Sequence, residues 1–107
     1  MIKLDSTNFN TQINSQSGLS IVYVDTVNSG KSQIMKFLIE RIEISYHSQI
    51  NFFHVNLNEL KKIDFSIEKK VLPYICFYHN NILKEEITDL MSYDDLLDSI
   101  QNIKLTS

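Results

Sequence analysis

The sequence predicts one α/β domain over residues 1–107, with a central mixed sheet of four to five strands and helices on both faces. Apolar, strand-like runs alternate with helical patterns through the first two-thirds of the chain, which is typical of parallel or mixed sheets. The last third predicts a tight antiparallel hairpin followed by a helix. The expected element order is therefore βαβαβαββα.

The first half of the chain supplies the alternating part of this pattern. Residues 1–4 predict a short strand, and residues 8–16 predict a short helix, capped by Ser6 or Asn8, that ends just before Gly18. Residues 19–25 predict a central strand, because β-branched and apolar residues occupy both of its faces. A long helix is expected from Lys31 to His47. Its apolar stripe is expected to consist of Ile34, Met35, Phe37, Leu38, Ile39 and Ile42.

The second half predicts the hairpin and the closing helix. Strands are expected over residues 50–56, 74–78 and 82–88, and one or two helical turns over residues 58–62. The His-Asn-Asn sequence at 79–81 predicts the hairpin turn, because asparagine tolerates the left-handed backbone conformation that such turns need. Ser92 and Asp95 predict a capping box at the start of the last helix. The apolar stripe of that helix is Leu96, Leu97, Ile100 and Ile103.

Composition excludes several classes of function. The net charge of −3 gives no basic field for nucleic acid. No apolar run approaches the roughly 18 residues of a membrane span, and the N-terminal residues show no signal region. The chain has one cysteine, Cys76, so it can form no internal disulfide, and we expect a cytoplasmic location.

The segment Ser29-Gly30-Lys31-Ser32 lies between the predicted central strand and the long helix, where chemistry is often sited. One interpretation is a degraded phosphate-binding loop, which requires a glycine, four residues and then Gly-Lys-Ser. Asp25 occupies the first glycine position, and its carboxylate would repel a phosphate. Weak anion or nucleotide binding at Gly30 to Ser32 nevertheless remains an alternative, because free N–H groups at a helix start attract anions.

The second interpretation comes from a resemblance to the thioredoxin-like superfamily, which extends from Ile21 to Ile103. The strand 21–24 runs into a loop at the position of the family's dithiol, and a long helix follows it. Residues 52–58 resemble the family's next strand. Residues 71–78, Val-Leu-Pro-Tyr-Ile-Cys-Phe-Tyr, are similar to the segment around its cis-proline, which would be Pro73. The resemblance implies the thioredoxin fold.

The departures from the family pattern concern its chemistry. By resemblance, the two active-site cysteines fall on Ser29 and Ser32, the buried carboxylate falls on Tyr23, and a buried lysine falls near His54. Thiol–disulfide exchange needs one thiolate that attacks and a second thiol that resolves, and serine can do neither. A divergent member in which Ser-Gly-Lys-Ser replaces the dithiol is therefore expected to be redox-inactive.

Other chemistry finds little support. A non-dithiol enzyme using Cys76 or Ser29 is an alternative, but Cys76 is expected to be buried on a strand, where a thiol is inert. A nucleophilic serine needs a base with an orienting acid. His47 is expected near the far end of the long helix and His79 on the distal hairpin turn, and no acid is evidently paired with His54. No group of side chains has metal-ligand spacing, and we expect neither metal nor cofactor.

What remains is binding. In the family, the active-site loop and the proline segment form a groove that pairs with an extended peptide, so we expect a protein or peptide partner of unknown identity. A cis bond before Pro73 would turn the backbone of Leu72 toward that groove. The expected binding face consists of Asn28, Ser29, Gly30, Lys31, Ser32, Leu72, Pro73 and Tyr74.

Overall fold

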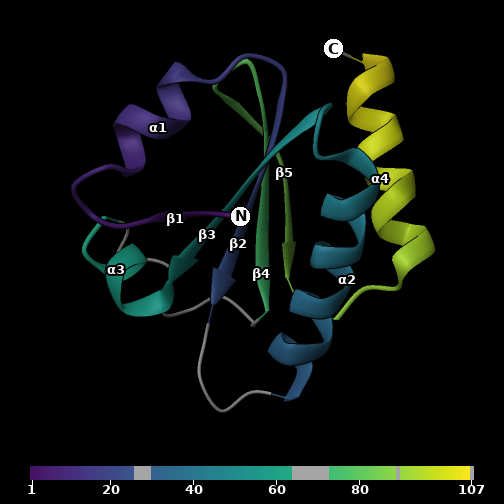
Figure 1. The fold of residues 1–107 in the computed structure, drawn as a ribbon, viewed down its shortest axis with the longest axis horizontal. Helices are drawn as coiled ribbons and strands as arrows, with labels where there is room; N and C mark the ends of the chain where they lie inside the picture. Colours follow the sequence, from purple (N-terminus) through teal and green to yellow (C-terminus); the bar gives the residue numbers. More distant parts are fainter. Residues whose placement is uncertain (26–29, 64–72, 89, 107) are drawn as a thin grey trace.

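The computed structural model describes residues 1–25, 30–63, 73–88 and 90–106 of the chain. The helices and strands follow the predicted order (Figure 1). They are β1 (Ile2–Leu4), α1 (Phe9–Ser15), β2 (Leu19–Asp25), α2 (Gly30–Tyr46), β3 (Ile50–Asn56), α3 (Leu57–Lys61), β4 (Tyr74–His79), β5 (Ile82–Thr88) and α4 (Tyr93–Thr106).

The sheet is five-stranded, with the order β1-β3-β2-β4-β5. Strands β1 and β2 are parallel to β3, whereas β4 is antiparallel to both β2 and β5. Helices α1 and α3 cover one face and α2 and α4 cover the other, as Figure 1 shows. The predicted mixed sheet with helices on both faces is therefore confirmed. This is the thioredoxin fold.

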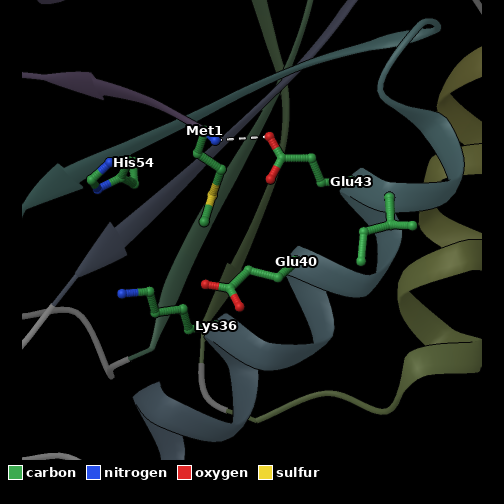
Figure 2. A pocket seen from close by; sticks show the side chains of 6 residues that line it. Met1, Lys36, Glu40, Glu43 and His54 are labelled. Atoms are coloured by element: carbon green, nitrogen blue, oxygen red, sulfur yellow. Dashed lines mark ion pairs between the residues drawn. The ribbon is translucent and has the colours of Figure 1, made fainter.

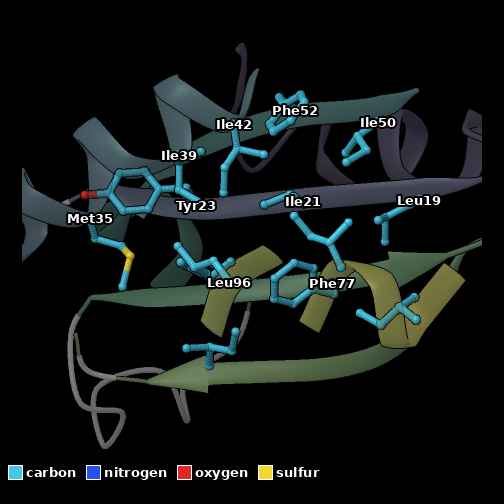
Figure 3. Close-up of a cluster of buried hydrophobic side chains, with 14 residues drawn as sticks. Leu19, Ile21, Tyr23, Met35, Ile39, Ile42, Ile50, Phe52, Phe77 and Leu96 are labelled. Atoms are coloured by element: carbon cyan, nitrogen blue, oxygen red, sulfur yellow. The ribbon is translucent and has the colours of Figure 1, made fainter. Parts of the chain in front are cut away.

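Strand β2 lies at the centre of the sheet and contributes to both cores. Leu19, Ile21 and Tyr23 pack toward α2 and α4 (Figure 3). Val22 and Val24 pack toward α1 and α3. Since successive side chains of a strand point to opposite faces, a strand buried on both sides must be apolar at almost every position. This requirement explains the continuous apolar run that the sequence shows there.

The buried side of helix α2 is narrower than the predicted apolar stripe. Met35, Ile39 and Ile42 are buried against the sheet, as a spacing of four and three residues requires. Ile34 and Phe37, which were expected in the same stripe, are 51% and 60% exposed. Apolar residues occur on several sides of this helix, so helical periodicity alone could not determine which side faces the sheet.

Side chains cap two of the other helices. The Asn56 side chain accepts a hydrogen bond from the Asn58 backbone N–H at the start of α3, at 2.8 Å. The Ser92 hydroxyl oxygen accepts one from the Asp95 N–H at 3.2 Å, which is one of the two bonds of the predicted capping box. Both contacts satisfy an N–H group that has no partner within its own helix.

Asn8 is the N-cap residue of α1, one of the two positions predicted, although its side chain makes no cap hydrogen bond. The Asp5 carboxylate instead accepts hydrogen bonds from the N–H groups of Thr7 and Asn8, at 2.8 and 3.0 Å. It also accepts one from the Thr7 hydroxyl, and these bonds lower the pKa of Asp5. Asp5, which precedes both predicted cap residues, therefore organises the turn that leads into α1.

The β4–β5 hairpin turns at Asn80 and Asn81, whose φ angles are +49° and +72°. The predicted turn is confirmed, although β4 extends through His79. The Asn80 side-chain oxygen accepts a hydrogen bond from the Gly18 N–H at 2.7 Å, and the Asn80 N–H donates to the Gly18 carbonyl oxygen at 3.0 Å. These two bonds tie the hairpin to the turn that precedes β2.

Candidate functional site

The described residues of the predicted binding face fall into two groups. Gly30 and Lys31 are exposed at the start of α2. Ser32, Pro73 and Tyr74 are buried. The remaining residues, Asn28, Ser29 and Leu72, lie outside the described residues, and so does the peptide bond that was expected to be cis.

A buried hydrogen bond joins the central strand to the first turn of α2. Tyr23 is 1% exposed, and its hydroxyl donates to the backbone carbonyl oxygen of Ser32 at 2.6 Å. Tyr23 sits near the end of β2, and its ring packs among apolar side chains of the α2–α4 core (Figure 3). A buried hydroxyl without a partner is costly, so this bond stabilises one placement of the helix start.

The surroundings of Gly30 and Ser32 do not favour a phosphate-binding loop. Ser32 is 0% exposed, so its hydroxyl is not presented to an external phosphate. A β-carbon added to Gly30 would meet nothing within 4 Å, so no close approach requires glycine at this position. Phosphate loops depend on glycine for close backbone approach to the ligand. The anion-binding alternative therefore rests on the helix N-terminus and Lys31 alone.

Tyr74 belongs to the predicted binding face, and its side chain is buried. It pairs with Val24 across β2 and β4, and its side chain packs into the core between the sheet and α1 and α3. The side chain is 4% exposed, so it does not line an open surface. Pro73 is also buried and forms a bend just before β4. Any contact of Tyr74 with a peptide would have to use its backbone.

The Tyr74 hydroxyl belongs instead to a small polar cluster inside this core. It hydrogen-bonds the Glu86 carboxylate of β5, and the Cys76 thiol is a further hydrogen-bond partner. Burial of the phenol raises the pKa of Tyr74 well above its ordinary value of 10.0, and the bond to Glu86 raises it further. Tyr74 therefore remains a protonated donor across the physiological range.

Cys76 lies next to this cluster on β4, an interior strand of the sheet. It forms no disulfide and is buried, as the sequence predicted. Its neighbours include the apolar side chains of Val22, Val24 and Leu60. Packing of this kind is typical of a structural cysteine.

An apolar surface beside the start of α2 was missed by the sequence reasoning, which assigned its residues to the core. Ile34 and Phe37 are exposed on the solvent side of the helix. Lys31, Ile34 and Phe37 are spaced three residues apart, so they lie on neighbouring parts of one helix face. We call Ile34 and Phe37 the α2 patch. Unequal exposure of apolar residues on one helix is a signal that only the packed structure supplies.

A separate groove of about 430 Å³ runs between α2 and the strands β1 and β3 (Figure 2). It is lined by Met1, Lys36, Glu40, Glu43, Ile44 and His54. The Met1 amine forms an ion pair with Glu43 at 2.8 Å. The groove is lined by both positively charged groups and carboxylates. Its charges therefore favour neither an anionic nor a cationic ligand. No serine or cysteine is among these lining residues, so the groove gives His54 no nucleophile to activate.

Within the described ranges, no group of three or more histidine, cysteine, aspartate or glutamate side chains could hold a metal ion. Among the helices described, none is both long and apolar enough to cross a membrane.

Comparison with known proteins supports the fold. No protein-family model matches the sequence, and no curated protein matches it. Among solved structures, the chain is similar to thioredoxin f2 of Chlamydomonas reinhardtii, with a TM-score of 0.82 and 21% identity, over 95% of this chain and 94% of that one. It is also similar to a chain from a study of thiol resolution in yeast mitochondrial 1-Cys peroxiredoxin by the glutathione and thioredoxin systems. That TM-score is 0.80 at 18% identity, over 95% and 94% of the two chains.

The hydrogen bond between Tyr23 and Ser32 gives a first testable prediction. Tyr23→Phe removes only the hydroxyl and should lower the free energy of unfolding by about 1 kcal/mol in urea denaturation. Tyr93→Phe is the control, because its ring contact with Arg41 at 4.6 Å survives the change. Equal losses in the two variants, or no loss in Tyr23→Phe, would show that the buried bond contributes nothing.

The raised pKa of Tyr74 gives a second prediction, at alkaline pH. The unfolded chain ionises Tyr74 near pH 10, whereas the folded protein keeps it protonated to a higher pH. The free energy of unfolding should therefore fall as pH rises above about 10, and fall less steeply in Tyr74→Phe. Absorbance titration of tyrosinate should give the same number of ionised tyrosines in both folded proteins. One extra group titrating near pH 10 in the native wild type would contradict the prediction.

Proposed function

We propose that this chain is a redox-inactive thioredoxin-fold protein that binds a protein or peptide partner through the surface at the start of α2. The observation that carries the proposal is the α2 patch, which places exposed apolar area beside the segment Ser29-Gly30-Lys31-Ser32. In this proposal the segment occupies the place of the family's dithiol loop. The molecule keeps the fold and a face suited to partners, and it lacks the thiol pair.

The redox half of the proposal is supported by composition and burial. A cycle of disulfide exchange within one molecule requires two cysteines, and the sequence contains one. That cysteine is buried on β4. Serine at positions 29 and 32 cannot form or break a sulfur–sulfur bond. A single-cysteine protein is also suited to the cytoplasm, which we propose as its location.

The binding half is supported by the exposure of large side chains. Exposed aromatic and aliphatic residues on a helix are typical of protein contact sites, where aromatic residues supply much of the binding energy. Phe37 is the largest exposed apolar side chain described. Gly30 and Lys31, one turn before the α2 patch, are also exposed and allow a partner to approach the end of the helix. The net charge of −3 gives no support to a nucleic-acid partner.

An enzyme that uses Cys76 or Ser29 is the less favoured alternative. The Cys76 side chain packs among apolar residues and the hydroxyl of Tyr74, with no histidine among the members of that core. A nucleophile requires a base within hydrogen-bond reach. Nucleotide binding at residues 30–32 is disfavoured by the burial of Ser32.

A capture experiment tests the proposed surface. The tagged chain is used to isolate partners from its source cells, and the affinity for any captured partner is then measured with purified proteins. Phe37→Glu should weaken binding by tenfold or more, which corresponds to about 1.4 kcal/mol, because it places a charge in the apolar contact. Its stability should change by less than about 0.5 kcal/mol, since Phe37 is exposed.

Ile44→Glu is the matched control. Ile44 is 77% exposed on the same helix, and it lies seven residues, or roughly 10 Å, beyond Phe37. Partner binding should survive this change. Equal binding by wild type and Phe37→Glu would refute the proposed surface, and so would equal loss in the two variants. Thiol-dependent reduction of insulin by the wild-type protein would refute the redox-inactive half.

A further inference from the structure

A cavity of about 180 Å³ lies on the opposite side of the sheet from the α2 patch, between the helices α1 and α3 and the strands β2, β4 and β5. Most of its lining is apolar or aromatic, and Glu86 alone among the described lining residues carries a charge. The lining residues are Phe9, Val22, Val24, Leu60, Ile63, Tyr74, Cys76, Tyr78, Leu83 and Glu86.

The helices described on this face are too short to cover the whole sheet. Helix α1 has seven residues and α3 has five, whereas α2 and α4 on the other face have 17 and 14. At about 1.5 Å per residue α1 is roughly 10 Å long, whereas a seven-residue strand such as β5 spans roughly 23 Å. The β5 edge is therefore partly open on this face, and Leu83 and Glu86 are exposed there.

The floor of the cavity is formed by the two interior strands β2 and β4. Val22 and Val24 pair with Cys76 and Tyr74, respectively, so the four side chains lie side by side on one face of the sheet. All four are buried. A ligand in the cavity would therefore rest on a largely apolar floor that the sheet itself holds in place.

The polar groups of the lining are bonded to one another. The Tyr74 hydroxyl donates to the Glu86 carboxylate, and the Cys76 thiol is a further hydrogen-bond partner of Tyr74. Glu86 is exposed, so its charge remains in contact with water at the mouth of the cavity. A charged ligand would lose water inside, which is costly unless a partner is dedicated to it. The described lining includes no lysine, arginine or histidine, and its one carboxylate is already engaged by Tyr74.

The size and the rings of the cavity narrow the ligand further. An engineered apolar cavity of about 150 Å³ binds benzene, so 180 Å³ accommodates one six-membered ring with a small substituent. The rings of Phe9, Tyr74 and Tyr78 line this space. Edge and face contacts between aromatic rings contribute about 0.5–1.5 kcal/mol beyond the burial of area, and a saturated ring forgoes them.

We propose that this cavity binds a small neutral aromatic molecule, a single benzene ring with one short apolar substituent. Ligand sites are commonly concave and mostly apolar, with a few placed polar groups. This binding goes beyond the proposed partner contact at the α2 patch, since the two sites lie on opposite faces of the sheet. No bond is made or broken in it.

Toluene is the probe, titrated into the full chain at neutral pH and followed by the methyl NMR signals of Val22, Val24 and Leu60. We expect saturable shifts with a dissociation constant of about 0.1–1 mM, which is appropriate for a ligand of this size. Absence of any saturable shift would overturn the site.

Three further compounds of similar size test the class of ligand. Benzylamine and benzoate, which are charged at neutral pH, should each bind about tenfold or more weakly than toluene, because their charges lose water in the cavity. Methylcyclohexane, which has no aromatic ring, should bind about threefold or more weakly. Equal or tighter binding of either charged compound would overturn the neutral class. Equal or tighter binding of methylcyclohexane would overturn the aromatic preference.

Two matched pairs of variants locate the ligand. Phe9→Leu removes one ring of the lining and should weaken toluene binding about threefold or more, whereas Tyr46→Leu, at a half-buried ring on the other face, should not. Leu83→Ala should widen the mouth and weaken binding, whereas Ile82→Ala, at an exposed neighbour outside the lining, should preserve it. Leu83 is 44% exposed, so its variant should fold even if Phe9→Leu does not. Equal effects within the Leu83 and Ile82 pair would refute the assignment, and so would equal effects in the other pair.

Discussion

The hydroxyl of Tyr23 is buried beneath the start of α2 and needs a hydrogen-bond acceptor. The backbone carbonyl oxygen of Ser32 provides one at 2.6 Å, and this contact ties the end of β2 to the start of α2. The tyrosine ring packs in the core beneath the helix, so one side chain both fills apolar volume and makes the hydrogen bond to the helix. Because β2 is the central strand, it also determines where the neighbouring strands and the two helical layers lie. The candidate surface at the start of α2 depends on this frame.

The same interaction shapes the proposed function. By resemblance, a carboxylate that assists proton transfer would stand where Tyr23 stands, and a phenol bound to a carbonyl oxygen is a structural group with no free base to offer. Ser32, whose carbonyl oxygen accepts the Tyr23 hydrogen bond, is fully buried. The exposed residues at this end of the helix are Gly30, Lys31 and the two residues of the α2 patch. In the proposed account, the region therefore has no reactive group at Tyr23 and presents exposed apolar side chains near the start of α2.

Much of this fold could be predicted from the sequence, and the failures have physical causes. Strand β2 was recognised because burial on both sides demands a continuous apolar run, and α4 because its apolar residues lie on one side only. Helix α2 carries isoleucines around much of its circumference, so its buried side depends on the docking against the sheet. Tyr74 was assigned to an open face because strand alternation does not reveal which layer covers which side.

The most direct test of the account asks whether the loop retains the geometry of the family's dithiol without its chemistry. The double variant Ser29→Cys, Ser32→Cys restores the two thiols at the positions that the resemblance assigns, with Cys76 replaced by serine in both this protein and its parent. After mild oxidation, mass spectrometry and thiol counting should show an intramolecular disulfide, and its reduction should be reversible in the folded protein. The expected result is a mass lower by two hydrogen atoms and no free thiol. Two persistently free thiols, or disulfides formed only between molecules, would contradict it.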